Sequence, residues 1–140
     1  MAFGFPVRVY WEDTDAGGIV FYANYLKFFE RARTEWLRSL GLEQQKLREQ
    51  TGGMFVVTQA QLQYQRPARL DDELLVTATL LESGRASLTI GHQALLKSEH
   101  ANVDTPSHTL LCEGSVRIGW VDGATMRPCR IPNLLLEQFS

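Results

Sequence analysis

Apolar residues recur at helical spacing through residues 22–40 and predict one long amphipathic helix. The apolar stripe begins at Phe21, one residue before this segment. It continues with Tyr25, Phe28, Phe29, Ala32, Trp36, Leu37 and Leu40. Gly41 stands where a left-handed glycine commonly ends a helix. Nineteen residues at helical rise make a rod of roughly 28 Å. Because so broad a stripe must be buried, we expect a sheet to wrap around this helix.

The rest of the chain is rich in alternating and β-branched segments, which predict strands. These segments are residues 5–12, 54–65, 73–83, 86–97 and 108–120. In the first segment, Val7, Val9 and Trp11 share one face. Ser83-Gly84-Arg85 predicts a tight hairpin between the third and fourth. We also expect a helical turn at 43–50, a polar loop at 98–107 and irregular chain at 121–133.

This order of strand, long helix and four strands predicts an α+β fold. Strands that follow a helix and are joined by short turns favour an antiparallel sheet with the helix on one face. A chain of 140 residues suits a single domain, residues 1–140, with a core of its own.

Composition and charge exclude several classes of protein. A net charge of −2 with mixed signs argues against nucleic-acid binding. The chain has no apolar run of about 18 residues or more that predicts a transmembrane helix, and its first residues lack the charged and apolar regions of a signal peptide, so none is expected. Cys112 and Cys129 are too few for a disulfide framework or a zinc site, which favours a cytoplasmic setting. The three histidines lack ligand-like spacing, so we expect no metal and no redox cofactor: they are His92, His100 and His108.

Residues 11–25 carry the candidate chemistry. Asp13 and Asp15 precede Gly17-Gly18, and the predicted helix follows. This order can set a carboxylate beside a helix N-terminus, where unpaired N–H groups and partial positive charge gather. Such a carboxylate can attack or activate water while the N–H groups hold an oxyanion. Taken alone, the residues favour an ordinary turn, because aspartates often flank turns and bind the nearby backbone.

Three segments carry a resemblance to a known family: Val7–Gly18, Tyr25–Glu35 and Pro67–Asp72. With them the chain resembles the hotdog-fold acyl-CoA thioesterases of the 4-hydroxybenzoyl-CoA thioesterase family. Within that family it is most similar to the acyl-CoA thioesterases associated with the Tol-Pal system. The resemblance in strand pattern extends to about residue 133. It implies a hotdog fold, in which a five-stranded antiparallel sheet wraps around the long central helix.

The resemblance implies hydrolysis of an acyl-CoA thioester and assigns site residues by position. The second aspartate of the family's Asp-x-Asp-x-x-Gly pattern falls on Asp15, as nucleophile or general base. The oxyanion donor, seven residues later, falls on the backbone N–H of Tyr22. Gly17 and Gly18 would let the backbone approach the substrate. Arg85, near a hairpin end, is the implied contact of a CoA phosphate, with a solvated surface arginine as the alternative.

The resemblance also implies partners. Two chains are expected to join their sheets in a homodimer, which often pairs again into a homotetramer. Acyl-CoA is the implied substrate, and acyl carrier protein is a second donor of the acyl group.

Many Tol-Pal-associated relatives have His at the position of Tyr22, where the hydroxybenzoyl branch has Tyr. Tyr keeps the N–H but removes an imidazole, so a His-assisted step is not expected. The resemblance to the Tol-Pal branch implies a small or aliphatic acyl-CoA, and Tyr22 keeps aromatic thioesters open.

The same fold is compatible with two other functions. A hydroxyacyl-thioester dehydratase needs a catalytic His near the site, and residues 1–91 contain none. A non-catalytic acyl-thioester sensor or an adaptor for envelope or lipid metabolism is the alternative retained. Asp15 together with the Gly-Gly loop argues against an inactive site.

The remaining polar residues of the helix have structural interpretations. Asn24 is expected to cap the helix, with a bond inside the loop as the alternative. Four charged residues are expected to form pairs on the helix surface or at a dimer interface: Glu30, Arg31, Arg33 and Glu35.

Overall fold

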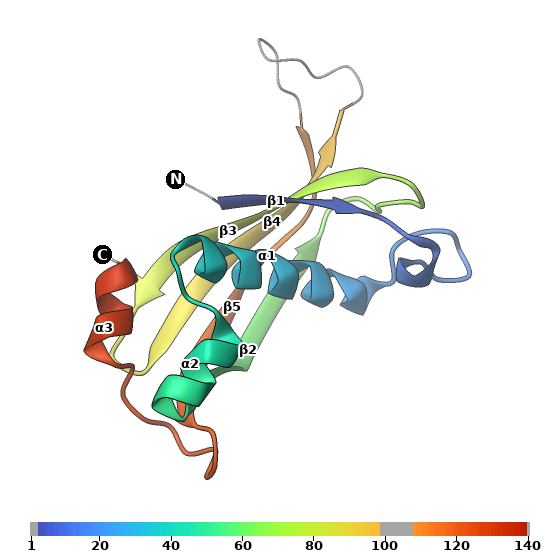
Figure 1. The fold of residues 1–140 in the computed structure, drawn as a ribbon. Helices are drawn as coiled ribbons and strands as arrows, with labels where there is room; N and C mark the ends of the chain where they lie inside the picture. Colours follow the sequence, from blue (N-terminus) through green and yellow to red (C-terminus); the bar gives the residue numbers. More distant parts are fainter. Residues whose placement is uncertain (1–2, 99–107, 140) are drawn as a thin grey trace.

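The computed structural model describes residues 3–98 and 108–139 (Figure 1). Its helices are α1 (Tyr25–Ser39), α2 (Gln44–Thr51) and α3 (Asn133–Leu136), and its strands are β1 (Phe3–Arg8), β2 (Gly53–Tyr64), β3 (Glu73–Ser83), β4 (Ser87–Lys97) and β5 (His108–Asp122). Three short 3-10 turns cover Trp11–Asp13, Tyr22–Asn24 and Glu137–Phe139. Residues 99–107 of the expected polar loop, including His100, lie outside the described residues.

The five strands form one antiparallel sheet in the order β1-β3-β4-β5-β2. Helix α1 lies across one face of this sheet, and α2 lies beside β2 (Figure 1). The predicted α+β class, with one long helix and a five-stranded antiparallel sheet, is confirmed.

The core lies between α1 and the sheet. The apolar stripe of α1 places Phe28, Phe29 and Ala32 at 0% exposure. They join a continuous cluster with buried residues of the sheet such as Val76 and Ile90. Periodicity therefore predicted the buried face, although Trp36 and Leu40 are only partly buried and Phe21 is exposed.

Glycine ends α1 as predicted. Gly41 has φ +83°, in the left-handed region that favours glycine. The N–H of Gly41 donates to the carbonyl of Arg38 at 2.9 Å, and the N–H of Leu42 donates to the carbonyl of Leu37 at 2.9 Å. These two bonds satisfy carbonyls that the helix end would otherwise leave open.

The first strand is shorter than predicted. β1 ends at Arg8, and Trp11 lies in a 3-10 turn with 82% of its surface exposed, so the prediction that the strand extends to residue 12 is wrong. The cause is a local hydrogen bond, in which the Tyr10 N–H donates to the Asp13 carboxylate at 2.9 Å. A side chain that binds the nearby backbone competes with the strand ladder and turns the chain.

Strand β2 forms an edge of the sheet, because β5 is its only partner among the described strands. It is 12 residues long, and most of its residues are exposed or half-buried. The pairing is irregular between Val57 and Gln59. A long edge with unpaired backbone groups can pair with another strand.

Within residues 3–98 and 108–139, no helix has the length and apolar character needed to cross a membrane.

Candidate active site

Asp15 begins a tight loop between the first 3-10 turn and the start of α1. Its N–H donates to the carbonyl of Ile19 at 2.9 Å, and its carbonyl accepts from the Gly18 N–H at 3.0 Å. A bridge between Thr14 and Val20 closes the same loop. Gly18 has φ +77°, a backbone conformation that side chains disfavour. The turn itself therefore favours glycine at position 18, whatever the relation of the loop to substrate.

The Asp15 carboxylate lies on the surface of this loop. Its Oδ1 accepts a hydrogen bond from the Gly17 N–H at 2.8 Å, and the residue is exposed. Among the residues that the structure describes, Gly17 is its only hydrogen-bond partner. One carboxylate oxygen is thus oriented by the loop while the other remains accessible to a ligand.

Asp13 has a different environment from Asp15, because only 5% of its surface is exposed. Its Oδ1 accepts from the Asn24 amide at 2.9 Å, and its Oδ2 accepts from the Tyr10 N–H at 2.9 Å. Its carbonyl accepts from the Phe21 N–H at 3.0 Å. Asp13 therefore ties the two ends of the loop together.

The prediction that Asn24 caps α1 is wrong. Asn24 already has helical backbone angles, φ −69° and ψ −22°, and its side chain makes no capping bond. A cap residue has extended angles so that its side chain can reach back to the first N–H groups. Here the amide instead reaches Asp13, which is the alternative of a bond inside the loop.

The segment after β2 supports the loop from a second side. The Val20 N–H donates to the carbonyl of Ala68 at 2.9 Å, and Ile19 bridges to Arg69. The Ala68 N–H donates in turn to the Tyr25 hydroxyl at 3.3 Å. Burial raises the pKa of Tyr25, so this phenol stays neutral. Residues 67–72, one of the three segments that carry the family resemblance, thus contact the candidate catalytic loop.

The 3-10 turn Tyr22–Asn24 leads directly into α1. The Tyr22 backbone N–H donates no hydrogen bond to another described residue. The carbonyl of Tyr22 accepts a hydrogen bond from the Tyr64 hydroxyl at 2.8 Å. The ring of Tyr22 is 65% exposed and packs on Phe21, with centroids 4.7 Å apart.

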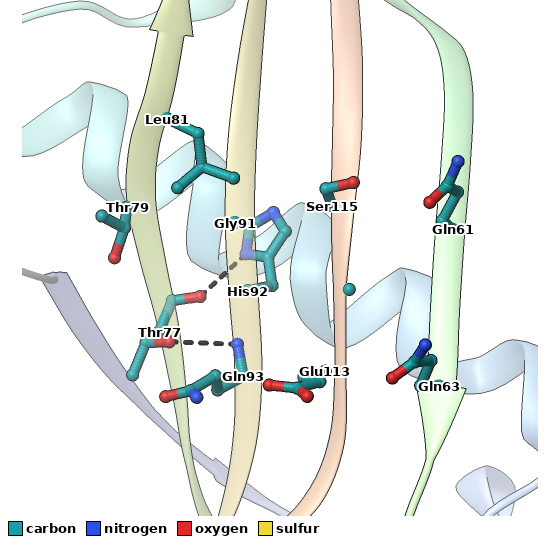
Figure 2. A pocket seen from close by; sticks show the side chains of 11 residues that line it. Gln61, Gln63, Thr77, Thr79, Leu81, Gly91, His92, Gln93, Glu113 and Ser115 are labelled. Carbon is teal, nitrogen blue, oxygen red and sulfur yellow. Dashed lines mark hydrogen bonds between the residues drawn. The ribbon is translucent and has the colours of Figure 1, made fainter.

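A cavity of about 310 Å³ opens beside this turn. It is lined by Ile19, Val20, Tyr22, Tyr25, Tyr64, Gln65, Arg66 and Pro67. Three tyrosine rings and aliphatic side chains make most of its wall. A larger hollow of about 510 Å³ lies over the sheet and has a polar lining that includes Gln61, Gln93 and Glu113 (Figure 2). Tyr22 lines the smaller cavity and not this hollow, and Asp15 lines neither, so the smaller cavity is the one beside the candidate site.

Arg33 and His92 form a buried pair under α1. The Nδ1 of His92 lies 2.8 Å from the Thr77 carbonyl and therefore donates to it, and Nε2 accepts from Arg33 at 3.2 Å. Burial, with the positive charge of Arg33, lowers the pKa of His92 to about 4. His92 also stacks on Phe29, with centroids 4.8 Å apart. The predicted surface pair for Arg33 is wrong, because only 7% of this side chain is exposed.

The hairpin that carries Arg85 is formed as predicted. The Gly84 N–H donates to the carbonyl of Ser87 at 2.8 Å, and the Ile131 N–H donates to the carbonyl of Arg85 at 2.8 Å. The β3–β4 turn lies near α3, at the end of the molecule away from the loop that leads into α1 (Figure 1). A single chain therefore does not bring Arg85 to Asp15.

Among residues 3–98 and 108–139, no three His, Cys, Asp or Glu side chains gather as a metal site.

Comparison with known proteins relates this arrangement to a family. Residues 9–139 match the thioesterase-like superfamily. The chain is 42% identical over 137 residues to the acyl-CoA thioesterase YbgC of Haemophilus influenzae, covering 98% of this chain and 93% of that protein. It is 40% identical over 137 residues to the acyl-CoA thioester hydrolase YbgC of Escherichia coli, covering 98% and 95%.

A solved structure agrees on the fold. A mutant 4-hydroxybenzoyl-CoA thioesterase, complexed with 4-hydroxybenzoyl-CoA, superposes with a TM-score of 0.88 at 19% identity and covers 99% of both chains. The predicted hotdog fold and the resemblance to acyl-CoA thioesterases are confirmed. With a family match over nearly its whole length and hydrolases among its relatives, the chain belongs to the thioesterase-like superfamily and is a thioesterase.

Proposed function

We propose that this thioesterase hydrolyses acyl-CoA, with Asp15 as the catalytic carboxylate and the Tyr22 backbone N–H as the oxyanion donor. The observation that carries the proposal is the single loop that holds both groups. Asp15 begins this segment with an exposed, oriented carboxylate, and Tyr22 ends it with an N–H that donates no hydrogen bond to another described residue. The non-catalytic alternative is not favoured, because the relatives are named as hydrolases.

The carboxylate has two routes to the same products. As a nucleophile, Asp15 attacks the thioester carbonyl, CoA leaves as the thiolate, and water hydrolyses the mixed anhydride. As a general base, Asp15 removes a proton from water, which attacks the carbonyl directly. Both routes pass through an oxyanion that a backbone N–H at a helix start can stabilise.

The relatives support acyl-CoA as the substrate, since both YbgC proteins carry acyl-CoA in their names. Acyl carrier protein remains a proposed second donor. Arg85 remains the proposed phosphate contact, supplied from a second chain, because the β3–β4 turn that carries it lies away from the loop that leads into α1 (Figure 1). A homodimer or homotetramer would provide that second chain. Gly17 and Gly18 are proposed to admit the substrate close to the loop.

Two broader expectations belong to the same proposal. We place the protein in the cytoplasm, and the free thiols of Cys112 and Cys129 agree with a reducing compartment. We also propose that residues 1–140 act as one domain, since a single sheet and one helix layer make up the core of the described residues.

The test is release of free thiol from acyl-CoA by Asp15→Asn. Asn is nearly isosteric with Asp but is neither a nucleophile nor a base, so turnover should fall to below about a tenth of wild type, a loss of more than ~1.4 kcal/mol in transition-state stabilisation. Asp122→Asn is the matched control. Its carboxylate also accepts from the N–H two residues later, at 2.9 Å, in another exposed turn. A larger residual rate in Asp15→Asn, with Asp122→Asn unchanged, would remove Asp15 from the mechanism.

A further inference from the structure

Tyr64 connects the edge of the sheet to the start of α1. It is the last residue of β2, and its hydroxyl donates to the Tyr22 carbonyl at 2.8 Å. Its ring meets two others edge-on, with centroids 6.5 Å from Tyr22 and 5.8 Å from Tyr25. The contact spans 42 positions of sequence.

The Tyr64 hydroxyl complements the anchors on the other side of the turn. Asp13 holds the turn Tyr22–Asn24 through the Phe21 N–H and the Asn24 amide. Tyr64 holds the same turn through the carbonyl of Tyr22. Partial burial raises the pKa of Tyr64, so the phenol is protonated at neutral pH and keeps donating. Fixing a catalytic group within a fraction of an ångström depends on this kind of supporting bond.

The ring of Tyr64 also forms part of the wall of the cavity of about 310 Å³. Tyr22 and Tyr25 provide two more aromatic walls, and Tyr22 also carries the proposed oxyanion donor. An acyl group bonded to a carbonyl at that N–H is therefore close to the cavity. Aromatic side chains gain edge-to-face and offset contacts with an aryl group that an alkyl chain does not provide.

We infer that Tyr64 is both a positioning and a specificity residue: its hydroxyl holds the turn that presents the Tyr22 N–H, and its ring helps the cavity to receive aromatic acyl groups. This inference rests on the proposed function. The hydroxyl and the ring of Tyr64 have separate roles, and each role can be tested with a different substitution. Tyr64→Phe removes the hydroxyl and keeps the ring, whereas Tyr64→Leu removes both.

The experiment measures thiol release from benzoyl-CoA and butyryl-CoA. Tyr64→Phe should lower kcat about three- to tenfold for both thioesters, the effect of one lost hydrogen bond. Its KM and the shape of its pH profile should not change, because the hydroxyl neither titrates in the reaction nor contacts the substrate, and the ring remains in place. Tyr64→Leu should in addition lower kcat/KM for benzoyl-CoA about tenfold more than for butyryl-CoA. Tyr10→Phe, which removes a hydroxyl from a tyrosine that is 62% exposed, is the matched control and should equal wild type.

Each role can fail separately. If Tyr64→Phe keeps kcat within about twofold of wild type for both thioesters, the hydroxyl does not position the turn. If Tyr64→Leu changes both thioesters equally, the ring does not select the acyl group. Thermal unfolding of every variant identifies a loss that comes from misfolding. If Asp15→Asn is inactive and the Tyr64 variants behave like wild type, the inference about Tyr64 is wrong and the proposed function stands. If Asp15→Asn is active, or if the wild type cleaves neither thioester, the proposed function is wrong as well.

Discussion

The side-chain amide of Asn24 donates to the Asp13 carboxylate at 2.9 Å, and both residues are buried. Asn24 directly precedes α1 and Asp13 precedes the loop, so this bond fixes the distance between the two ends of the candidate active site. The carboxylate of the neighbouring Asp15 accepts one local hydrogen bond and stays exposed. The two aspartates of one motif therefore have separate environments: the first holds the loop together, and the second, the proposed catalytic carboxylate, lies on its surface.

Asp13→Asn should lower the free energy of unfolding by about 1–3 kcal/mol. Both oxygens of Asp13 accept from N–H donors, so either orientation of the new amide sets a donor against a donor. Turnover should also fall, but less than in Asp15→Asn, because the reacting carboxylate remains. Urea unfolding and thiol release measure the two effects. Glu12→Gln, at an exposed neighbouring position, is the control, and equal stability of the two variants would contradict the role of Asp13.

Local patterns were sufficient for most of the fold. Residues 73–83 were predicted as a strand and form β3 (Glu73–Ser83), and Gly41 ends α1 in the left-handed conformation. Such features depend on neighbours within a few residues. Arg33 was misassigned because its burial depends on His92, a residue 59 positions away. The spacing of apolar residues along a helix does not indicate a contact with a residue so distant in the sequence.

The candidate site was predicted in part for the same reason. Asp15, Gly17 and Gly18 form a contiguous motif, and their turn is local. Tyr64 was visible only as an alternating residue of a strand, because its approach to Tyr22 depends on how β2 crosses the start of α1. The family resemblance supplied the role of Asp15, which the residues alone left as an ordinary turn.

His92 should make stability depend on pH. Its pKa is lowered to about 4 in the folded protein, mainly by burial, and is about 6.5 in an unfolded chain. The unfolded state therefore binds more protons between these values. Stability should be full above about pH 6.5 and fall by as much as about 3 kcal/mol as the pH drops toward 4.

Urea unfolding from pH 7 to pH 4 measures this dependence. His92→Gln should show a shallower decline, since it removes the titrating group. His108→Gln is the control, because His108 is an exposed histidine on β5. The same decline in His92→Gln as in wild type would assign the pH dependence to other groups.

The free edge of β2 should bind a second chain. Light scattering at low micromolar concentration should report a dimer or tetramer, because a long unpaired edge favours association. Val57 on β2 is 55% exposed, and Val57→Lys should weaken the dimer, since a charge at an edge opposes pairing. Leu81→Lys changes an equally exposed leucine, 57%, that lines the hollow over the sheet face (Figure 2). It should leave the dimer intact, and a well-folded wild-type monomer would count against edge pairing.

Substitutions of Tyr22 test the backbone donor. Tyr22→Phe should keep turnover within about threefold of wild type, since the N–H and most ring contacts remain. Tyr22→Pro should be severe because it deletes the N–H itself. The fold should tolerate this proline, because Tyr22 opens the 3-10 turn and Phe21 before it is extended, with φ −60° and ψ 133°. Circular dichroism and thermal unfolding check that tolerance. High activity in a folded Tyr22→Pro protein would eliminate the Tyr22 N–H as the oxyanion donor.

Tyr22→His tests whether an imidazole at this position can add to the mechanism. The ring of Tyr22 is 65% exposed, so a histidine there should titrate near its ordinary pKa of about 6.5. If catalysis uses only the backbone N–H, the variant should keep the wild-type pH profile of kcat/KM and a rate within about threefold. A new inflection near pH 6.5 together with a large gain in rate would show that an imidazole at this position transfers protons. A large loss in Tyr22→Phe would instead require the phenol, and the backbone-only account of Tyr22 would have to be replaced.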